Sequence, residues 1–244
     1  MSVTIPAFWQ LLADSRLHPR ELCDSLAADF AQVKGAGDQA SARTLAEWLV
    51  SRNVLSKYQA TILLAGRAGP FQYGEYKVYD RVDKGRLAGL FRAVHGSTGH
   101  PVLLSFASGQ ALADPNHWAA AAANTWSASA IVSPHLQRWF EPVDAVIYKF
   151  LVSEDLRGAT AEERMTAGRF PPAEACRLAR QAALGLAQLH AAGRVHGEVR
   201  PANLLLEPIP GQAANAKLLW NAHETLGPWN LAEEPPPSRF ASSS

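Results

Sequence analysis

The segment V-H-G-E-V-R-P-A-N-L-L-L at 195–206 constrains the fold of this chain more than any other part of its sequence. Before it, apolar residues recur at helical spacing up to Gly193, which predicts an amphipathic helix over 174–190. After it, apolar runs at 204–206 and 216–220 are separated by a stretch rich in proline and glycine, which predicts a hairpin. The expected local order is therefore helix, loop and hairpin. The apolar residues of the helix are Ala175, Leu178, Ala179, Ala182, Leu186 and Leu189.

The loop resembles the catalytic loop of protein kinases, H-R-D-x-x-x-x-N, whose Asp accepts the proton of the substrate hydroxyl and whose Asn holds a magnesium ion. Glu198 stands at the position of the Asp, and Gly197 stands at the position of the Arg. The resemblance implies a protein-kinase-like fold in which Glu198 and Asn203 are the catalytic positions, with altered chemistry. The residues that keep the pattern are His196, Arg200, Pro201 and Asn203.

The residues from Tyr76 onward alternate as in a hairpin and align with the glycine-rich loop of the kinases, G-x-G-x-x-G-x-V, which covers the nucleotide phosphates. In this alignment Asp83, Gly85 and Ala88 take the glycine positions, and Leu90 takes the Val position. One glycine of three remains, and Asp83 would place a negative charge near the phosphates. Gly85 also suits an ordinary turn of a hairpin, which is the preferred interpretation.

The next strand, predicted over 98–106, resembles the kinase strand V-A-I-K, whose Lys pairs with the nucleotide phosphates. Ser105 occupies the position of that Lys. The resemblance thus implies a degenerate nucleotide site at Gly85, Ala88, Leu90 and Ser105.

The Glu that pairs with this Lys in the kinases would fall near Asn124, within a segment, 118–130, that contains no Glu. Lys84 or Arg86 could replace the missing Lys from the neighbouring hairpin. A solvated charge is nevertheless the expected role of both side chains.

The K-L-L strand at 217–219 resembles the strand that leads into the metal-binding D-F-G motif. Trp220 occupies the position of the Asp and is followed by Asn221 and Ala222. An indole offers no oxygen ligand and Asn203 alone cannot hold the ion, so no metal site is expected. Each electrostatic contributor to phosphoryl transfer is worth about 3 kcal/mol, roughly a hundredfold in rate. The combined losses therefore predict a pseudokinase.

Residues 1 to about 68 are expected to form a separate helical segment. Its last helix follows the capping-box sequence S-K-Y-Q at 56–59, and the Gly-Ala-Gly at 35–37 breaks its second helix. The order of this block and the following Y-K-V strand resembles the N-terminal extension of a group of bacterial serine/threonine kinases. A docking module and a packing annex to the small lobe are both open, and the annex is the expected role. The predicted helices cover 4–12, 19–33, 42–50 and 56–66.

These features predict an α+β fold, with a protein-kinase-like small lobe and a partial helical large lobe after an all-α segment. Few residues follow Ala222, and they end in E-E-P-P-P-S-R-F-A-S-S-S, so the activation segment and later helices of the kinases are expected to be absent. The apolar face of helix 174–190 would then be uncovered, which predicts a protein that is not stable as an isolated monomer. The predicted boundaries are 1–70 for the helical extension, 71–152 for the small lobe, 153–228 for the partial large lobe and 229–244 for a disordered tail.

Composition argues against several classes of partner. With 48% hydrophobic and 18% charged residues, the chain can bury a sizeable core. Its formal net charge of +1 provides no basic field for nucleic acid or a membrane surface, so neither is an expected partner. No segment approaches the ~18 apolar residues of a membrane span, and the N-terminus lacks the features of a signal peptide. Cys23 and Cys176 have no paired spacing and are expected to be reduced, buried thiols of a cytoplasmic protein.

The expected function is that of a catalytically inactive pseudokinase, which acts as a protein-binding or regulatory module without a cofactor. Its expected partner is another protein, either an active kinase or a second copy of this chain. The alternative is a residual or unconventional ATP-dependent serine/threonine phosphotransferase. That enzyme would bind ATP and magnesium, with Glu198 as the base and Asn203 as a metal ligand. A third interpretation is a purely structural fragment of a decaying gene.

Overall fold

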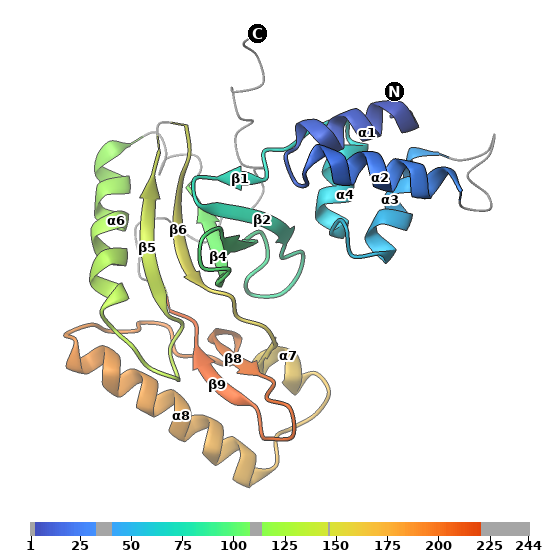
Figure 1. Cartoon of the computed structure of the whole chain (residues 1–244). Coiled ribbons are helices and arrows are strands. Elements are labelled where there is room, and N and C mark those ends of the chain that lie inside the picture. The colour runs from blue at the N-terminus through green and yellow to red at the C-terminus, as the bar shows by residue number, and fades with distance from the viewer. Residues whose placement is uncertain (1–2, 33–40, 108–113, 146, 221–244) are drawn as a thin grey trace. The chain divides into compact units, whose positions relative to one another are not determined.

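The computed structural model describes residues 3–32, 41–107, 114–145 and 147–220, which form two compact units (Figure 1). Among these residues, the first unit comprises 3–81 and 93–100. The second unit comprises 82–92 and 101–220. The hairpin loop and the catalytic-loop segment predicted above therefore belong to the same unit.

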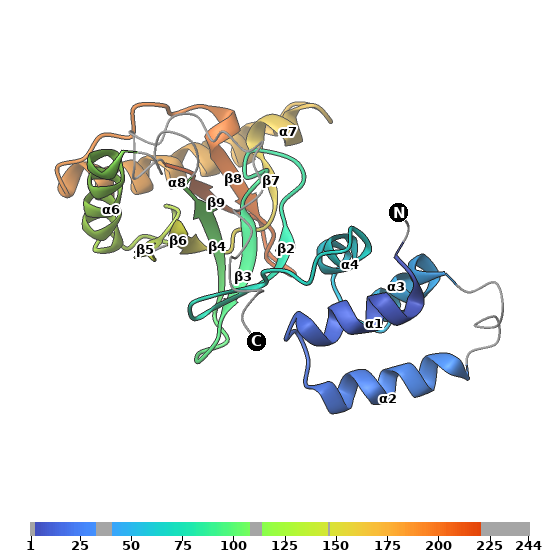
Figure 2. The ribbon, with the colours of Figure 1, turned by 90° about the horizontal axis from the view of Figure 1, so that it is seen from above.

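The first unit begins with four helices: α1 (Ile5–Asp14), α2 (Arg20–Ala31), α3 (Ala42–Ser51) and α4 (Lys57–Leu64). Figure 2 shows these helices gathered in one bundle. The side chains of Thr4, Ser41 and Ser56 accept hydrogen bonds from the first turns of α1, α3 and α4, as N-cap residues do. The predicted capping box at Ser56 is confirmed. The bundle core includes Phe8, Leu12, Leu26, Leu45, Leu49 and Leu63.

The bundle is an internal repeat of two helical hairpins, which was not recognised in the sequence. Both connecting turns contain a non-glycine residue with a left-handed backbone, Arg16 at φ 55° and Asn53 at φ 57°. The two turns are joined because His18 Nε2 lies 2.8 Å from the Val54 carbonyl oxygen. At one constant offset, the N-caps, core positions and turns of α1–α2 match those of α3–α4: Thr4 with Ser41, Phe8 with Leu45, Leu12 with Leu49, Arg16 with Asn53, Pro19 with Ser56, Cys23 with Ala60, and Leu26 with Leu63.

The helices of the first unit pack against the strand that follows them. Strand β1 (Gln72–Tyr73) pairs antiparallel with β2 (Tyr76–Arg81). Buried Gln59 of α4 donates a hydrogen bond of 3.2 Å to the Val78 carbonyl, and Lys77 Nζ donates one of 2.7 Å to the Leu17 carbonyl. Burial also lowers the pKa of Lys77. These contacts attach the helical bundle to β2 within the first unit.

The second unit contains an antiparallel sheet in the order β4 (Pro101–Phe106), β6 (Lys149–Glu154) and β5 (Trp139–Asp144). Helix α6 (Pro115–Ser129) runs along β5 (Figure 1). The strand predicted over 98–106 begins only at Pro101. Strand β3 (Phe91–His95) follows the hairpin loop at 82–90. The buried core below β5 includes Leu136, Trp139, Leu151, Leu189 and Leu218.

The remaining elements of the second unit surround the predicted catalytic loop. Strand β7 (Ala159–Thr160) leads into the short helix α7 (Ala161–Met165), and β7, β8 (Leu204–Glu207) and β9 (Asn215–Leu218) form a three-stranded sheet. Helix α8 (Pro172–Ala191) lies against this sheet, and a 3-10 turn (Pro201–Asn203) precedes β8 (Figure 1). The predicted order of helix, loop and hairpin is therefore confirmed.

One expectation about the cysteines is corrected, and other expectations lie outside the described residues. Cys23 is buried as predicted, but Cys176 is exposed because it lies on the outer face of α8. The leucines of α8 differ in burial: Leu178 and Leu189 are buried, whereas Leu184 is exposed. The glycine break at 35–37 and the tail at 229–244 are not among the described residues. No helix within the described ranges has the length and apolar character that a membrane span needs.

Candidate functional site

The loop between α8 and β8 brings the two predicted catalytic residues together. The Asn203 side chain is 1% exposed, and its Nδ2 donates to the Glu198 carbonyl oxygen at 2.9 Å and to Glu198 Oε2 at 3.0 Å. Glu198 Oε1 also pairs with Arg200 Nη2 at 2.9 Å. The Asn203 carbonyl accepts a hydrogen bond of 2.8 Å from the Leu219 amide. Both carboxylate oxygens of Glu198 are therefore already engaged by the loop itself.

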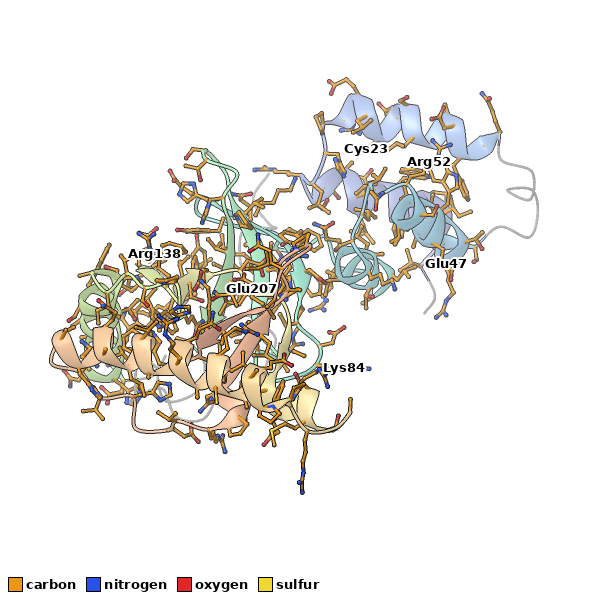
Figure 3. The ribbon with its side chains drawn as sticks, turned by 90° about the horizontal axis from the view of Figure 1, so that it is seen from below. Cys23, Glu47, Arg52, Lys84, Arg138 and Glu207 are labelled. Carbon is orange, nitrogen blue, oxygen red and sulfur yellow. The ribbon has the colours of Figure 1, made fainter. Side chains whose placement is uncertain are left out.

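Arg86 of the hairpin loop completes this network. Its Nε donates a hydrogen bond of 2.7 Å to Asn203 Oδ1, the amide oxygen that would hold magnesium in the resembled kinases. Arg86 is half-buried, so the expectation of a solvated charge is wrong for this residue. The same expectation is confirmed for Lys84, which is exposed and projects away from the ribbon (Figure 3). The Arg86 guanidinium is thus hydrogen-bonded to the Asn203 oxygen that a metal ion would need as a ligand.

The backbone of the hairpin loop is hydrogen-bonded to itself. The amide of Val82 donates to the Leu90 carbonyl at 2.8 Å, the amide of Gly89 to the Val82 carbonyl at 2.7 Å, and the amide of Ala88 to the Gly85 carbonyl at 3.1 Å. A phosphate-cradling loop needs free amides that point at the ligand. The amides at the Ala88 and Gly89 positions are instead used within the loop.

Gly85 has two reasons to be glycine. Its φ of +78° is left-handed, and a Cβ at this position would lie 2.9 Å from Oε1 of Glu163. Glu163 in turn caps α7, since its Oε2 accepts a hydrogen bond of 2.7 Å from the Thr160 amide. These features support the preferred interpretation of Gly85 as a turn glycine, and they place the loop directly against α7.

A buried cluster of leucines joins the hairpin loop to β4, to β8 and to the residue that follows β9. Leu87 and Leu90 of the hairpin loop are 7% and 2% exposed. Of these leucines, only Leu90 is a site residue predicted from the sequence. The buried cluster consists of Leu87, Leu90, Leu103, Leu156, Leu205 and Leu219.

Ser105 is the penultimate residue of β4, pairs with Leu151 of β6, and is 9% exposed. Within the described residues its hydroxyl is not part of the Arg86–Asn203–Glu198 network. Helix α6 carries no Asp or Glu over Pro115–Ser129, so no acidic residue of this helix stands in for the Glu of the kinase ion pair. The structure therefore does not join Ser105 to the other predicted site residues.

Trp220 is a core residue. It is 5% exposed, and its Nε1 donates a hydrogen bond of 2.9 Å to the Gln137 carbonyl. It packs in the cluster that holds Trp118, Leu136 and Trp139. The position that carries the metal-binding carboxylate in the kinases thus contains a buried hydrogen-bond donor. Asn221 and Ala222 are outside the described residues.

The neighbouring Lys217 of β9 has a structural partner. Its Nζ lies 2.6 Å from Glu154 Oε2, and their side chains are 12% and 20% exposed. Glu154 Oε1 also accepts a hydrogen bond of 2.7 Å from the Arg138 amide. Lys217 therefore joins β9 to the end of β6 and is not directed at a ligand.

The donor set does not fit a magnesium ion with its nucleotide. Magnesium requires several oxygen ligands in near-octahedral geometry. The candidate oxygens are Asn203 Oδ1, which is bonded to Arg86, and the Glu198 carboxylate, which is bonded to Arg200 and Asn203. Over the described ranges, no group of three or more His, Cys, Asp or Glu side chains could hold a metal ion.

The surroundings of His196 favour its neutral form. Its Nδ1 accepts a hydrogen bond of 3.2 Å from the Glu198 amide, so the ring proton is on Nε2, which is buried. Burial lowers the pKa of His196 below its ordinary value of 6.5, while the Leu219 backbone and the Glu198 carboxylate act in the opposite direction. The folded protein therefore favours the uncharged ring.

This shift predicts a loss of stability in mild acid. Because the unfolded chain binds a proton to His196 near pH 6.5 and the folded chain does so only at lower pH, stability is full above pH 6.5 and falls as the pH drops toward the folded pKa. Melting temperatures measured between about pH 8 and pH 5 should fall less for His196→Gln than for wild type. Equal acid dependence in the two proteins would contradict a lowered pKa for His196.

Comparisons with known proteins give the following similarities. The probable serine/threonine-protein kinase pknA2 of Bifidobacterium longum is 27% identical over 139 residues, which are 54% of this chain and 18% of that protein. The putative CBL-interacting protein kinase 13 of rice (Oryza sativa subsp. japonica) is 25% identical over 138 residues, covering 57% of this chain and 27% of that protein. The chain thus spans less than a third of each curated relative. No protein-family model matches it.

A solved structure shares the fold. The crystal structure of the PknI kinase domain of Mycobacterium tuberculosis matches with a TM-score of 0.52 and 18% sequence identity. The match covers 62% of this chain and 61% of that domain. The matched part of the chain therefore has a kinase-like fold, in agreement with the α+β prediction.

Proposed function

Since the chain is kinase-like and related to the Hanks-type serine/threonine protein kinases, we propose that it is a pseudokinase that acts by binding another protein. The main support for this proposal is the buried Trp220 at the position of the metal-binding Asp. Phosphoryl transfer depends on metal ions that neutralise the charge on the phosphates. A buried indole at the metal position supplies no oxygen ligand, and its N–H is committed to the Gln137 carbonyl.

The nucleotide side of the site supports the same proposal. The hairpin loop uses its own amides, Ser105 replaces the phosphate-binding Lys, and the leucine cluster fills the space beneath the loop. Arg86 supplies a positive charge, but its Nε is bonded to Asn203. These features favour a fold that closes without a nucleotide.

A protein partner is the role that fits a kinase-like fold without transfer chemistry. Val195 and Val199 of the catalytic-loop segment are 75% and 55% exposed, and Leu184 of α8 is 43% exposed. Exposed apolar side chains of this size are available to a protein partner. We propose an active kinase or a second copy of this chain as the partner.

The alternative of a residual phosphotransferase rests on Glu198 and Asn203, whose side chains keep a 3.0 Å contact. A glutamate can still accept a proton. In this loop, however, the Glu198 carboxylate already binds Arg200 and Asn203. A free base and a metal ligand would require both contacts to break.

A phosphate-transfer assay with radiolabelled ATP, magnesium and a generic protein substrate tests the proposed function. Wild type should incorporate no more label than Glu198→Ala or Asn203→Ala, measured side by side at equal protein concentration. Circular dichroism should confirm that all three proteins are folded. Incorporation by wild type that both variants lose would support the phosphotransferase instead.

A further inference from the structure

We infer that Arg86 does in this chain what a bound nucleotide and its metal ion do in active relatives, and that it latches the hairpin loop at 82–90 closed onto the catalytic loop. The inference deepens the proposed pseudokinase function and rests on it. In the kinases the glycine-rich loop and the catalytic-loop Asn meet through phosphates and magnesium. Here the two loops meet directly, through the 2.7 Å hydrogen bond from Arg86 Nε to Asn203 Oδ1.

The latch is a continuous chain of polar side chains that includes two cations, an amide and a carboxylate. The Arg86 guanidinium binds Asn203, Asn203 binds Glu198, and Glu198 binds Arg200. Asn203 is 1% exposed, and all its side-chain polar groups have partners in this chain. Hydrogen bonds to charged groups are the stronger class, and a buried amide left without a partner is costly. Losing Arg86 would therefore leave the Asn203 oxygen unsatisfied beneath the loop.

Apolar and ionic contacts hold the same loop from its other sides. Leu87 and Leu90 are buried in the leucine cluster with Leu205 and Leu219, which both follow the catalytic loop in sequence. The downstream end of the loop is held by Arg92, which pairs with the buried Asp155 carboxylate. Because these contacts come from the chain itself, the closed loop does not depend on a small ligand.

The consequence is a kinase-like unit with one nucleotide-independent conformation. In the kinases, the glycine-rich loop covers the phosphates of a nucleotide, which is a separate molecule that can leave. A guanidinium fixed to the chain cannot leave, so the surface formed by the hairpin loop and the catalytic loop stays constant. A constant surface suits a protein-binding role.

Hydrogen–deuterium exchange on the full chain tests the latch. Arg86→Ala should speed exchange of the Ala88, Gly89 and Leu90 amides by about tenfold or more, because a charge-assisted hydrogen bond is lost. Lys84→Ala is the matched control, since it removes an exposed cation two residues away in the same loop. It should leave these amides within about twofold of wild type. Unchanged protection of helix α8 amides at 178–189 verifies that each variant remains folded.

A second pair of variants makes the test independent of any single substitution. Asn203→Ala should accelerate the same loop amides, and the Arg86→Ala/Asn203→Ala double variant should exchange no faster than the faster single variant, because both remove one shared contact. Equal loop exchange in Arg86→Ala and Lys84→Ala, or full additivity in the double variant, would overturn the latch. Label transfer by wild type would overturn the pseudokinase proposal, while the exchange result alone decides the latch.

Discussion

Replacing Trp220 by alanine should lower the free energy of unfolding of the second unit by about 3–5 kcal/mol. The side chain is 5% exposed and packs among the largest buried residues of its core, so its loss opens a cavity between β5, α8 and β9. It also leaves the Gln137 carbonyl without its 2.9 Å donor. Chemical denaturation followed by circular dichroism measures the change without depending on indole fluorescence.

Trp126→Ala is the matched control for this experiment. Trp126 lies on the same unit but is 56% exposed, so its removal should change stability by less than about 0.5 kcal/mol. Trp220→Asp should be more damaging than Trp220→Ala, because it buries a carboxylate among apolar groups. Equal effects of the Trp220 and Trp126 alanine variants would show that Trp220 is not a core residue.

Replacing Gly158 by alanine should also be strongly destabilising. Gly158 has a φ of +141°, and a Cβ at this position would lie 2.1 Å from the Leu206 carbonyl oxygen of β8. The unfavourable φ costs about 1–3 kcal/mol, and the clash with backbone adds about 1–3 kcal/mol. Since Ala159 pairs with Leu206, the clash would disturb the strand that follows the catalytic loop.

Gly168→Ala separates these two contributions. Gly168 has a similar φ of +133°, but a Cβ there would meet nothing within 4 Å. Gly168→Ala should lower the free energy of unfolding only through the unfavourable φ, by about 1–3 kcal/mol. The difference between the two variants, measured by denaturant unfolding, reports the close approach to β8. No difference between them would contradict the packing of the 158–160 segment against Leu206.

Local features of the site were predictable from the sequence. Glu198 and Asn203 are five residues apart in one loop, so a motif at the right spacing was enough to bring them together. The helix before the loop and the hairpin after it also follow from short-range periodicity. The capping box at Ser56 was read in the same way.

Long-range contacts were not predictable. Arg86 and Asn203 are far apart in the chain, and a charge in a polar hairpin is ordinarily solvated. The leucine cluster draws its members from five separate segments, so no local pattern reveals it. The repeat of the two helical hairpins is likewise hidden, because matching positions share burial and backbone conformation more than residue identity. The strand predicted over 98–106 is too long at its start, because a turn at 96–98 and two residues without regular structure precede β4.

Titration of the purified chain with ATP, with magnesium and with a chelator in its place, tests most directly whether this kinase-like unit lacks a nucleotide site. The melting temperature is predicted to be the same in both conditions at every ATP concentration, because the phosphates meet neither a metal ligand set nor free loop amides. A ligand at a hundredfold excess over its Kd would stabilise a competent site by about 2.7 kcal/mol. A magnesium-dependent rise of the melting temperature that grows with ATP would contradict the account.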